Sequence, residues 1–200
     1  MTSHLIDTLT ALAARVDEGV AEAFASDAVT ALTDAEVVDA LRVAGQILRR
    51  VEGAVIETVG EAASRTDTGE RAESLFRGFG CHNLSELLQK VTLVAPGPAA
   101  RWVRAAKTVH SERAFTTGEL LPAQFPAMRD ALRDGVIGVD GLLAATGPLV
   151  EAARRVDRES FLTADTELAA VARGEGMDGS PPACADLLRV HATVWANVLD

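Results

Sequence analysis

The chain has 200 residues, 48% hydrophobic and 4% aromatic, so it is long and apolar enough to fold around small aliphatic side chains rather than remain disordered. Its two cysteines, Cys81 and Cys184, lie far apart and outside any CxxC or Cys/His cluster, which favours idle thiols in a reducing cytoplasm. The formal net charge of −10 is unevenly spread, because residues 1–76 carry −8, residues 77–113 carry +4 and residues 114–200 carry −6.

Apolar residues at positions 5, 9, 12, 16 and 20 predict a first helix that ends near Phe24. The same stretch has no basic n-region and carries Asp7, so we do not expect a signal peptide. No segment approaches the roughly 20 uninterrupted apolar residues that a membrane helix needs. We therefore expect a cytoplasmic protein that does not bind a membrane.

A second, longer helix is predicted to begin at TDAE, where Thr33 and Glu36 have the spacing of a capping box. Apolar residues then recur in steps of three and four, at positions 37, 41, 44, 48, 51, 55, 59 and 62, which predicts a helix of about 30 residues. This seam has two interpretations. It is either part of a bundle within the chain or a homodimer interface through residues 37–62. The homodimer remains an alternative because the chain has few large side chains that could cover the seam.

A polar, Gly-bearing connector over residues 65–82 is expected to separate N-terminal helices in 1–64 from a helical core in 83–200. Asn83 with Glu86 predicts the start of a helix over 84–92, which APGP ends before Pro98 opens the next. Gly147-Pro148 indicates a break, with further helices over 148–156, 162–173 and 181–199, the last capped by Ser180. No strand-like alternation persists between turn signals. The predicted fold is all-α: a multi-helix bundle with one long early helix and helix-turn-helix-like pairs.

Within residues 120–149, two apolar helical patterns meet at Asp134-Gly135, where glycine permits the left-handed backbone that closes a helix. The second of these helices, VDGLLAATGP, has no Arg, Lys, Asn or Gln to read base edges. The first places Arg129 and Arg133 beside acidic neighbours. We therefore interpret this segment as a packing corner rather than a DNA-reading motif.

The basic segment 77–113 contains the stronger candidate for nucleic-acid contact. At about 100° per residue, its helix 97–113 divides into an apolar face and a face of basic and hydroxyl side chains, both of which can donate to phosphate oxygens. With the helix 84–92 before it, this makes a helix-turn-helix-like pair, although a cationic helix face is also common on plain solvated surface. The candidate contacts to double-stranded DNA are Lys90, Arg101, Arg104, Lys107, Thr108, Ser111 and Arg113.

Signals for catalysis are poor. The four histidines are scattered, with no HExxH, and the glycine-rich RGFG and GEGMDG match neither a P-loop nor a dinucleotide fingerprint. His110 and His191 lie on or near apolar helix faces and are expected to be core histidines. A small-molecule enzyme would need a pocket around one of them. We expect no catalytic residue, no metal site and no cofactor in this chain.

The pattern LSELL … APGPAARWVRAA … LLPAQFPAMRDALRDGVIGVDGLLA resembles a domain of unknown function common in actinobacterial proteins, the 13E12-repeat family, from about residue 33 onward. This family usually stands N-terminal to an HNH endonuclease domain. Gly138 and Asp140-Gly141 depart from it, since the family often has Ser and His there. The matching positions are Arg101, Arg104, Ala105, Leu121, Pro122, Ala131, Leu132, Gly135 and Ile137.

The resemblance implies a non-catalytic N-terminal module of an HNH-endonuclease-like protein that assists DNA binding or targeting. The nuclease domain itself is absent, because CHN at residues 81–83 is not followed by a second His or a metal-binding hairpin. The alternative is a helical dimerisation or protein-interaction module without DNA contact, which docks a second copy or a C-terminal HNH domain.

Overall fold

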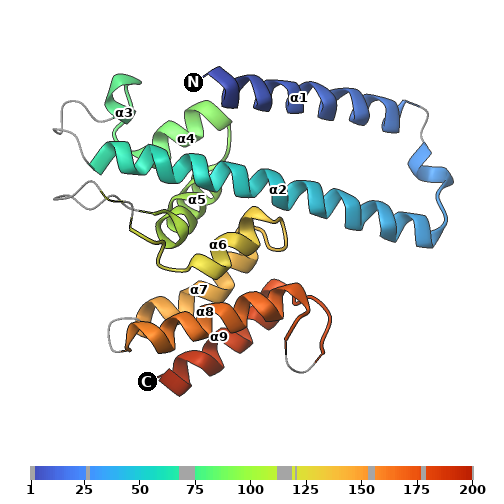
Figure 1. Ribbon diagram of the computed structural model, residues 1–200. Coiled ribbons are helices and arrows are strands. Elements are labelled where there is room, and N and C mark those ends of the chain that lie inside the picture. The colour runs from blue at the N-terminus through green and yellow to red at the C-terminus, as the bar shows by residue number, and fades with distance from the viewer. Residues whose placement is uncertain are drawn as a thin grey trace. The chain divides into compact units, whose positions relative to one another are not determined.

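The computed structural model describes residues 3–25, 28–67, 75–111, 119, 121–152, 156–176 and 179–199. Every regular element in these ranges is a helix, which confirms the predicted all-α class with one long early helix (Figure 1). The elements are α1 (Ser3–Phe24), η1 (Ala28–Ala31), α2 (Asp34–Asp67), α3 (Leu75–Gly78), α4 (Leu84–Thr92), α5 (Pro96–Val109), α6 (Pro126–Arg133), α7 (Val139–Ala152), α8 (Arg158–Arg173) and α9 (Ala185–Leu199).

Contacts divide the chain into two units, Met1–Gly45 and Gln46–Asp200, with the division inside α2. The first unit contains α1, η1 and the beginning of α2. The predicted capping box opens α2: the Thr33 backbone N–H donates to Glu36 Oε2 at 2.8 Å, and the Glu36 N–H donates to Thr33 Oγ1 at 3.4 Å. None of the described side chains between residues 4 and 45 is buried.

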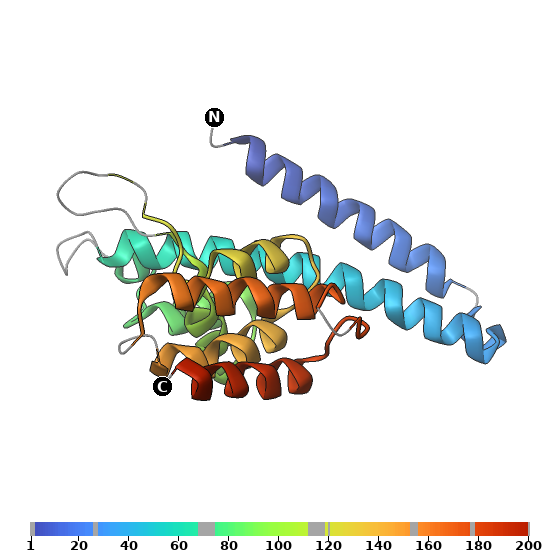
Figure 2. The ribbon, with the colours of Figure 1, turned by 60° about the horizontal axis from the view of Figure 1, so that its bottom comes forward.

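The second unit has a core of aliphatic side chains around α7. Leu142, Ala145 and Leu149 of α7 are fully buried. Helix α7 packs along α9 and against α5 and α6, while α8 packs against α6 and α9 (Figure 2). The C-terminal part of α2 adds Ile56 and Val59 to this core, so α2 takes part in both units.

Two arginines of α2 bind the C-terminal end of α6. Arg49 Nε donates to the Gly135 carbonyl at 2.8 Å, and Arg50 Nη1 donates to the Arg133 carbonyl at 3.0 Å. Gly135 has a φ of +69°, and the N–H groups after it return to carbonyls of α6, which is the Schellman ending that the Asp134-Gly135 turn predicted. Positive side chains at this end also complement the helix dipole.

Carboxylates from neighbouring helices bind the N-terminal ends of α6 and α7. Glu52 Oε2 of α2 accepts the Val139 N–H at 3.0 Å, where α7 begins. Asp165 of α8 is fully buried, and its two oxygens accept the Ala127 N–H at 2.7 Å and the Met128 N–H at 3.2 Å. Each satisfies backbone donors that the first turn of a helix leaves without partners. The α6–α7 segment is thus fixed at its ends by α2 and α8, as a packing corner requires.

Several predicted boundaries in the second half are wrong. Helix α7 continues through Pro148, because Leu149 and Ala152 beyond the proline are buried and this packing outweighs the lost N–H bond. Helix α8 begins at Arg158 rather than 162, since Asp157 Oδ1 caps it by accepting the Ser160 N–H at 2.9 Å.

The ends of the predicted connector and of the last helix also differ. Helix α2 runs to Asp67, so residues 65–67 of the predicted connector are helical, while 68–74 lie outside the described residues. Helix α5 begins at Pro96, two residues before Pro98. The last helix begins at Ala185 rather than at Pro181 beside a Ser180 cap, because a residue that precedes another proline is disfavoured in the helical conformation.

Candidate functional site

The helix pair α4–α5 is built from local signals that the sequence displays. Asn83 Oδ1 accepts the Glu86 N–H at 2.9 Å, and Glu86 Oε2 accepts the His82 N–H at 2.7 Å, so the predicted helix start is confirmed. Leu93 ends α4 in a left-handed conformation with φ of 58°, an uncommon state for a bulky residue. Pro96 then opens α5 after a short turn.

The predicted cationic side chains differ in their exposure and in whether they already bind another residue of the chain. Arg104 and Lys107 are exposed and lie three residues apart on α5. The side chain of Arg101 is 44% exposed and forms an ion pair with Asp140 of α7. Lys90 is exposed but donates from Nζ to the Phe79 carbonyl at 2.9 Å. Arg113 lies outside the described residues.

The two predicted hydroxyl contacts do not lie on the surface, which corrects the face assigned from the sequence. Thr108 is 7% exposed, and its Oγ1 donates to the Ala105 carbonyl at 2.8 Å. Ser111 is also 7% exposed, and its Oγ accepts from Arg129 Nη1 at 2.5 Å. Helix α5 packs against α4, α6 and α7, so less of its circumference faces solvent than a two-sided amphipathic pattern implies. Thr108 and Ser111 are therefore structural residues.

An ion cluster joins α2 and α6 and was not predicted from the sequence. Both oxygens of Glu57 accept from the guanidinium of Arg129 at 2.9 Å, and both accept from Arg133 at 3.0 and 3.1 Å. Burial alone would raise the pKa of Glu57, but hydrogen bonds from the two arginines outweigh it and lower the pKa to about 2. The only sequence signal was the four-residue spacing of the arginines; their partner is far away in the sequence. A permanently paired carboxylate of this kind holds helices together rather than moving protons.

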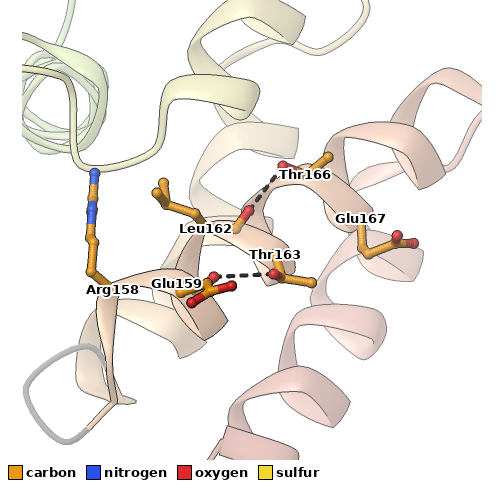
Figure 3. Close-up of a pocket in the computed structure, with 6 residues that line it drawn as sticks. All are labelled: Arg158, Glu159, Leu162, Thr163, Thr166 and Glu167. Carbon is orange, nitrogen blue, oxygen red and sulfur yellow. Dashed lines mark hydrogen bonds between the residues drawn. The ribbon is translucent and has the colours of Figure 1, made fainter.

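A shallow pocket of about 530 Å³ lies on the outer side of α8, and it has no catalytic arrangement (Figure 3). The hydroxyls of Thr163 and Thr166 donate to the carbonyls of Glu159 and Leu162, one turn earlier in the same helix. Arg158 instead donates to two backbone carbonyls of the segment before α6. The lining residues are Arg158, Glu159, Leu162, Thr163, Thr166 and Glu167.

His110 is half-buried where α5 ends, and its Nδ1 is buried without a hydrogen-bond partner among the described residues. The ring packs against Gly60 of α2, where a Cβ atom would lie 2.5 Å from Nδ1. It also lines a pocket of about 420 Å³ with Lys107 and Arg158, a pocket whose described lining contains no carboxylate that could act with the imidazole as an acid–base pair. This environment fits a packed histidine better than a catalytic one. His191 of α9 is likewise partly buried.

The described part of the chain contains neither a metal-binding cluster nor a membrane-spanning helix. No group of three His, Cys, Asp or Glu side chains there is arranged to hold a metal ion. None of the helices in the same part is long and apolar enough to cross a membrane. Cys81 is buried and Cys184 is exposed, and both are free thiols.

The largest unexplained feature is apolar and lies on α1 and the beginning of α2. All five residues that predicted the first helix are exposed there, including Leu5 at 62% and Leu12 at 48%. The seam of α2 divides in two. Its last three positions, Val55, Val59 and Ala62, pack into or against the core of the second unit. Its earlier large residues are exposed: Val37, Leu41, Leu48 and Val51.

Comparisons with protein-family models, with curated proteins and with solved structures found no match for this chain. Function therefore has to be inferred from the chain's own surfaces. Among those that remain after the structural roles are assigned are the exposed apolar faces of α1 and the beginning of α2, the exposed cations of α4–α5, and a shorter exposed apolar stripe on α9. The α9 stripe consists of Leu187, Val190, Val194 and Val198.

Proposed function

We propose that this chain is a non-catalytic helical module that binds protein partners through the apolar faces of α1 and the beginning of α2. The single observation that carries the proposal is the concentration of exposed large hydrophobic side chains on these helices, from Leu5 to Val51. Exposed apolar side chains concentrated along a helix face are rare on a protein that works alone and are typical of interaction sites. In this proposal the ion cluster and the helix caps stabilise the second unit and have no catalytic role.

In-cell photo-crosslinking tests this function directly. A photoreactive amino acid replaces Leu12 on α1 in the full chain, and the protein is irradiated inside its host cells. We expect covalent adducts at this position. The matched control carries the same amino acid at Val198 of α9, which is 71% exposed and lies in a shorter apolar stripe outside α1 and α2. Adducts that are no stronger at residue 12 than at residue 198 contradict an interaction module.

A second candidate function is contact with double-stranded DNA beside a C-terminal HNH nuclease domain, as the family resemblance implies. The observation that favours it is the exposure of Arg104 and Lys107 next to each other on α5, with Lys90 on the packed neighbour α4. Three phosphate contacts give a salt slope of only about −2.7, since each contributes about 0.9. The surface therefore assists binding rather than providing it alone.

DNA titrations across a salt series test this second function. Replacing both Arg104 and Lys107 by Glu is expected to weaken binding at low salt and to reduce the magnitude of the salt slope by about 1.8, since two phosphate contacts are lost. The control is Arg189→Glu, which reverses an exposed charge on α9 and should leave binding unchanged. Wild-type affinity that is equal to that of the double variant removes DNA contact through α5.

A further inference from the structure

The exposed apolar side chains of α1 lie on one side of the helix. At about 100° per residue, Leu5, Ile6, Leu9, Leu12, Val16, Val20 and Phe24 fall within an arc of about 120°. On α2, Val37, Leu41, Leu48 and Val51 fall within about 80° by the same measure. Both helices thus present a stripe with spacings of three and four residues, the pattern that packs against another helix with the same pattern.

The acidic residues of α1 do not interrupt its stripe. Asp7, Asp17, Glu18 and Glu22 all fall outside the apolar arc when α1 is plotted in this way. The positions that flank the stripe of α2 include the uncharged Val38, Ala40 and Ile47, and also Asp34 and Glu52, of which Glu52 accepts the Val139 N–H. Neither arc contains a charged residue, so a second copy with the same net charge is not repelled within the stripes themselves.

The apolar area that the two stripes expose is large enough for a dimer interface. A half-exposed aliphatic side chain leaves roughly 50 Å² of apolar surface in water. The seven side chains on α1 and four on α2, with Val38 beside them, offer on the order of 600 Å² per chain. This lies within the range of about 600–1,000 Å² that each partner contributes to a stable interface of standard size.

We propose that the occupant of these faces is a second copy of this chain, and that α1 and α2 of the two copies form a four-helix arrangement. The inference rests on the proposed interaction function and names its partner. An identical chain supplies both stripes at once, so each copy covers the other through a self-complementary, two-fold contact. The contact ends near Val51, because Val55 and Val59 already pack in their own chain.

Light scattering and sedimentation of the purified full-length chain test the proposal. We expect a dimer at micromolar concentration. Leu9→Glu with Leu41→Glu is expected to raise the dissociation constant at least about 100-fold, because the dimer would have to bury carboxylates without partners. Both residues are exposed in the single chain and lie outside its core, so the urea unfolding of the second unit should be unchanged. The control is Val190→Glu with Val198→Glu on α9, two residues that are equally exposed and should leave the dimer intact.

The outcomes separate this proposal from the function on which it rests. A dimer that the α1–α2 variant dissociates and the α9 control does not supports it. A wild-type chain that stays monomeric at 100 μM, about a hundredfold above micromolar, overturns the second copy. So does a dimer that only the α9 control dissociates. If the monomeric chain still forms adducts at residue 12 in cells, the interaction function stands with a different partner; without adducts, both fail.

Discussion

Glu57 binds two arginines of α6 at once, and a single substitution measures how much these ion pairs contribute to the free energy of unfolding. Replacing Glu57 by Gln leaves Arg129, whose side chain is 16% exposed, without a counter-ion. We expect a loss of about 1.5–3 kcal/mol in the free energy of unfolding at pH 7, the range for hydrogen bonds to charged groups. Urea denaturation measures it. The control is Glu61→Gln one turn later, which breaks an exposed pair with Arg65 and should cost about 0.3–0.5 kcal/mol.

The same variant has a defined pH dependence. Because the folded pKa of Glu57 is about 2 and its ordinary pKa is 4.5, the stabilisation from the ionised carboxylate is complete above pH 4.5. It is lost as the pH falls from 4.5 through 2. The gap in unfolding free energy between wild type and Glu57→Gln should therefore close across this window. A gap that is constant from pH 6 to pH 2 contradicts the charge pairing and leaves only a packing effect.

Two aspartates cap helices in this chain, and burial gives them opposite pH dependences. Burial raises the pKa of Asp165 to about 6, although the N–H groups of Ala127 and Met128 act against it. The exposed Asp157 has a lowered pKa, because the Ser160 N–H stabilises its charge. The stability that protonated Asp165 contributes is complete below its ordinary pKa of 3.8 and is lost as the pH rises through 6, whereas the contribution of ionised Asp157 is lost as the pH falls.

Unfolding measurements of Asp165→Asn and Asp157→Asn from pH 2 to pH 7 distinguish the two caps, because Asp157 acts below its ordinary pKa of 3.8 and Asp165 between 3.8 and 6. Relative to wild type, the deficit of Asp165→Asn should shrink as the pH rises, and that of Asp157→Asn should grow. At pH 7 we expect Asp165→Asn to cost about 1–3 kcal/mol, since an amide nitrogen cannot accept from a buried N–H. Parallel profiles for the two variants would show that burial does not set the titration of Asp165.

At the scale of the elements, the contact between α2 and the end of α5 depends on Gly60. Replacing Gly60 by Ala places a Cβ 2.5 Å from Nδ1 and 2.8 Å from Cγ of His110. We expect destabilisation of about 1–3 kcal/mol from overpacking, against the roughly 1 kcal/mol by which alanine favours a helix. Thermal or urea unfolding measures the difference.

Gly19→Ala on α1 is the matched control for this substitution. Nothing lies within 4 Å of a Cβ at Gly19, so only helix propensity should act and the change should be neutral or mildly stabilising. Removing the ring in Gly60→Ala/His110→Ala should recover part of the stability that Gly60→Ala loses. If Gly60→Ala is as harmless as Gly19→Ala, the close approach of α2 to His110 is not rigid.

Local signals predicted the starts of α2 and α4 correctly, because capping is decided within four residues, whereas the starts of α5, α8 and α9 were misplaced. Thr33 with Glu36 and Asn83 with Glu86 form the bonds that their spacing implied. The break predicted at Pro148 was wrong, because packing between α7 and α9 offsets the free-energy cost of a proline inside a helix. This packing joins residues that are too far apart in the sequence for a local pattern to predict it. Thr108 was misplaced for a related reason: helical periodicity gives the angle of a side chain but not the number of helices around it. The sequence pattern likewise could not predict the partner of Arg129 and Arg133, since Glu57 is distant in the sequence.

At the scale of the whole molecule, the two units differ in what stabilises them. The second has a continuous buried core from α2 to α9, whereas the first has helices with no buried side chains among its described residues. Helices that bury no side chain are weakly stabilised, because most helical stability in proteins comes from packing of an apolar face. The first unit is therefore the part whose stability a partner can change most.

Hydrogen exchange measures this difference and its dependence on concentration. At nanomolar concentration we expect amides of α1 to exchange within the shortest labelling times, while those of α7 exchange only through global unfolding. Raising the concentration to tens of micromolar should slow exchange in α1 and in the first turns of α2, because a second copy covers their apolar faces and stabilises them by mass action. Exchange in α7 should not change. The α1–α2 double variant Leu9→Glu/Leu41→Glu should abolish the concentration dependence in α1. Strong protection of α1 at nanomolar concentration would show that its apolar face is already covered within one chain.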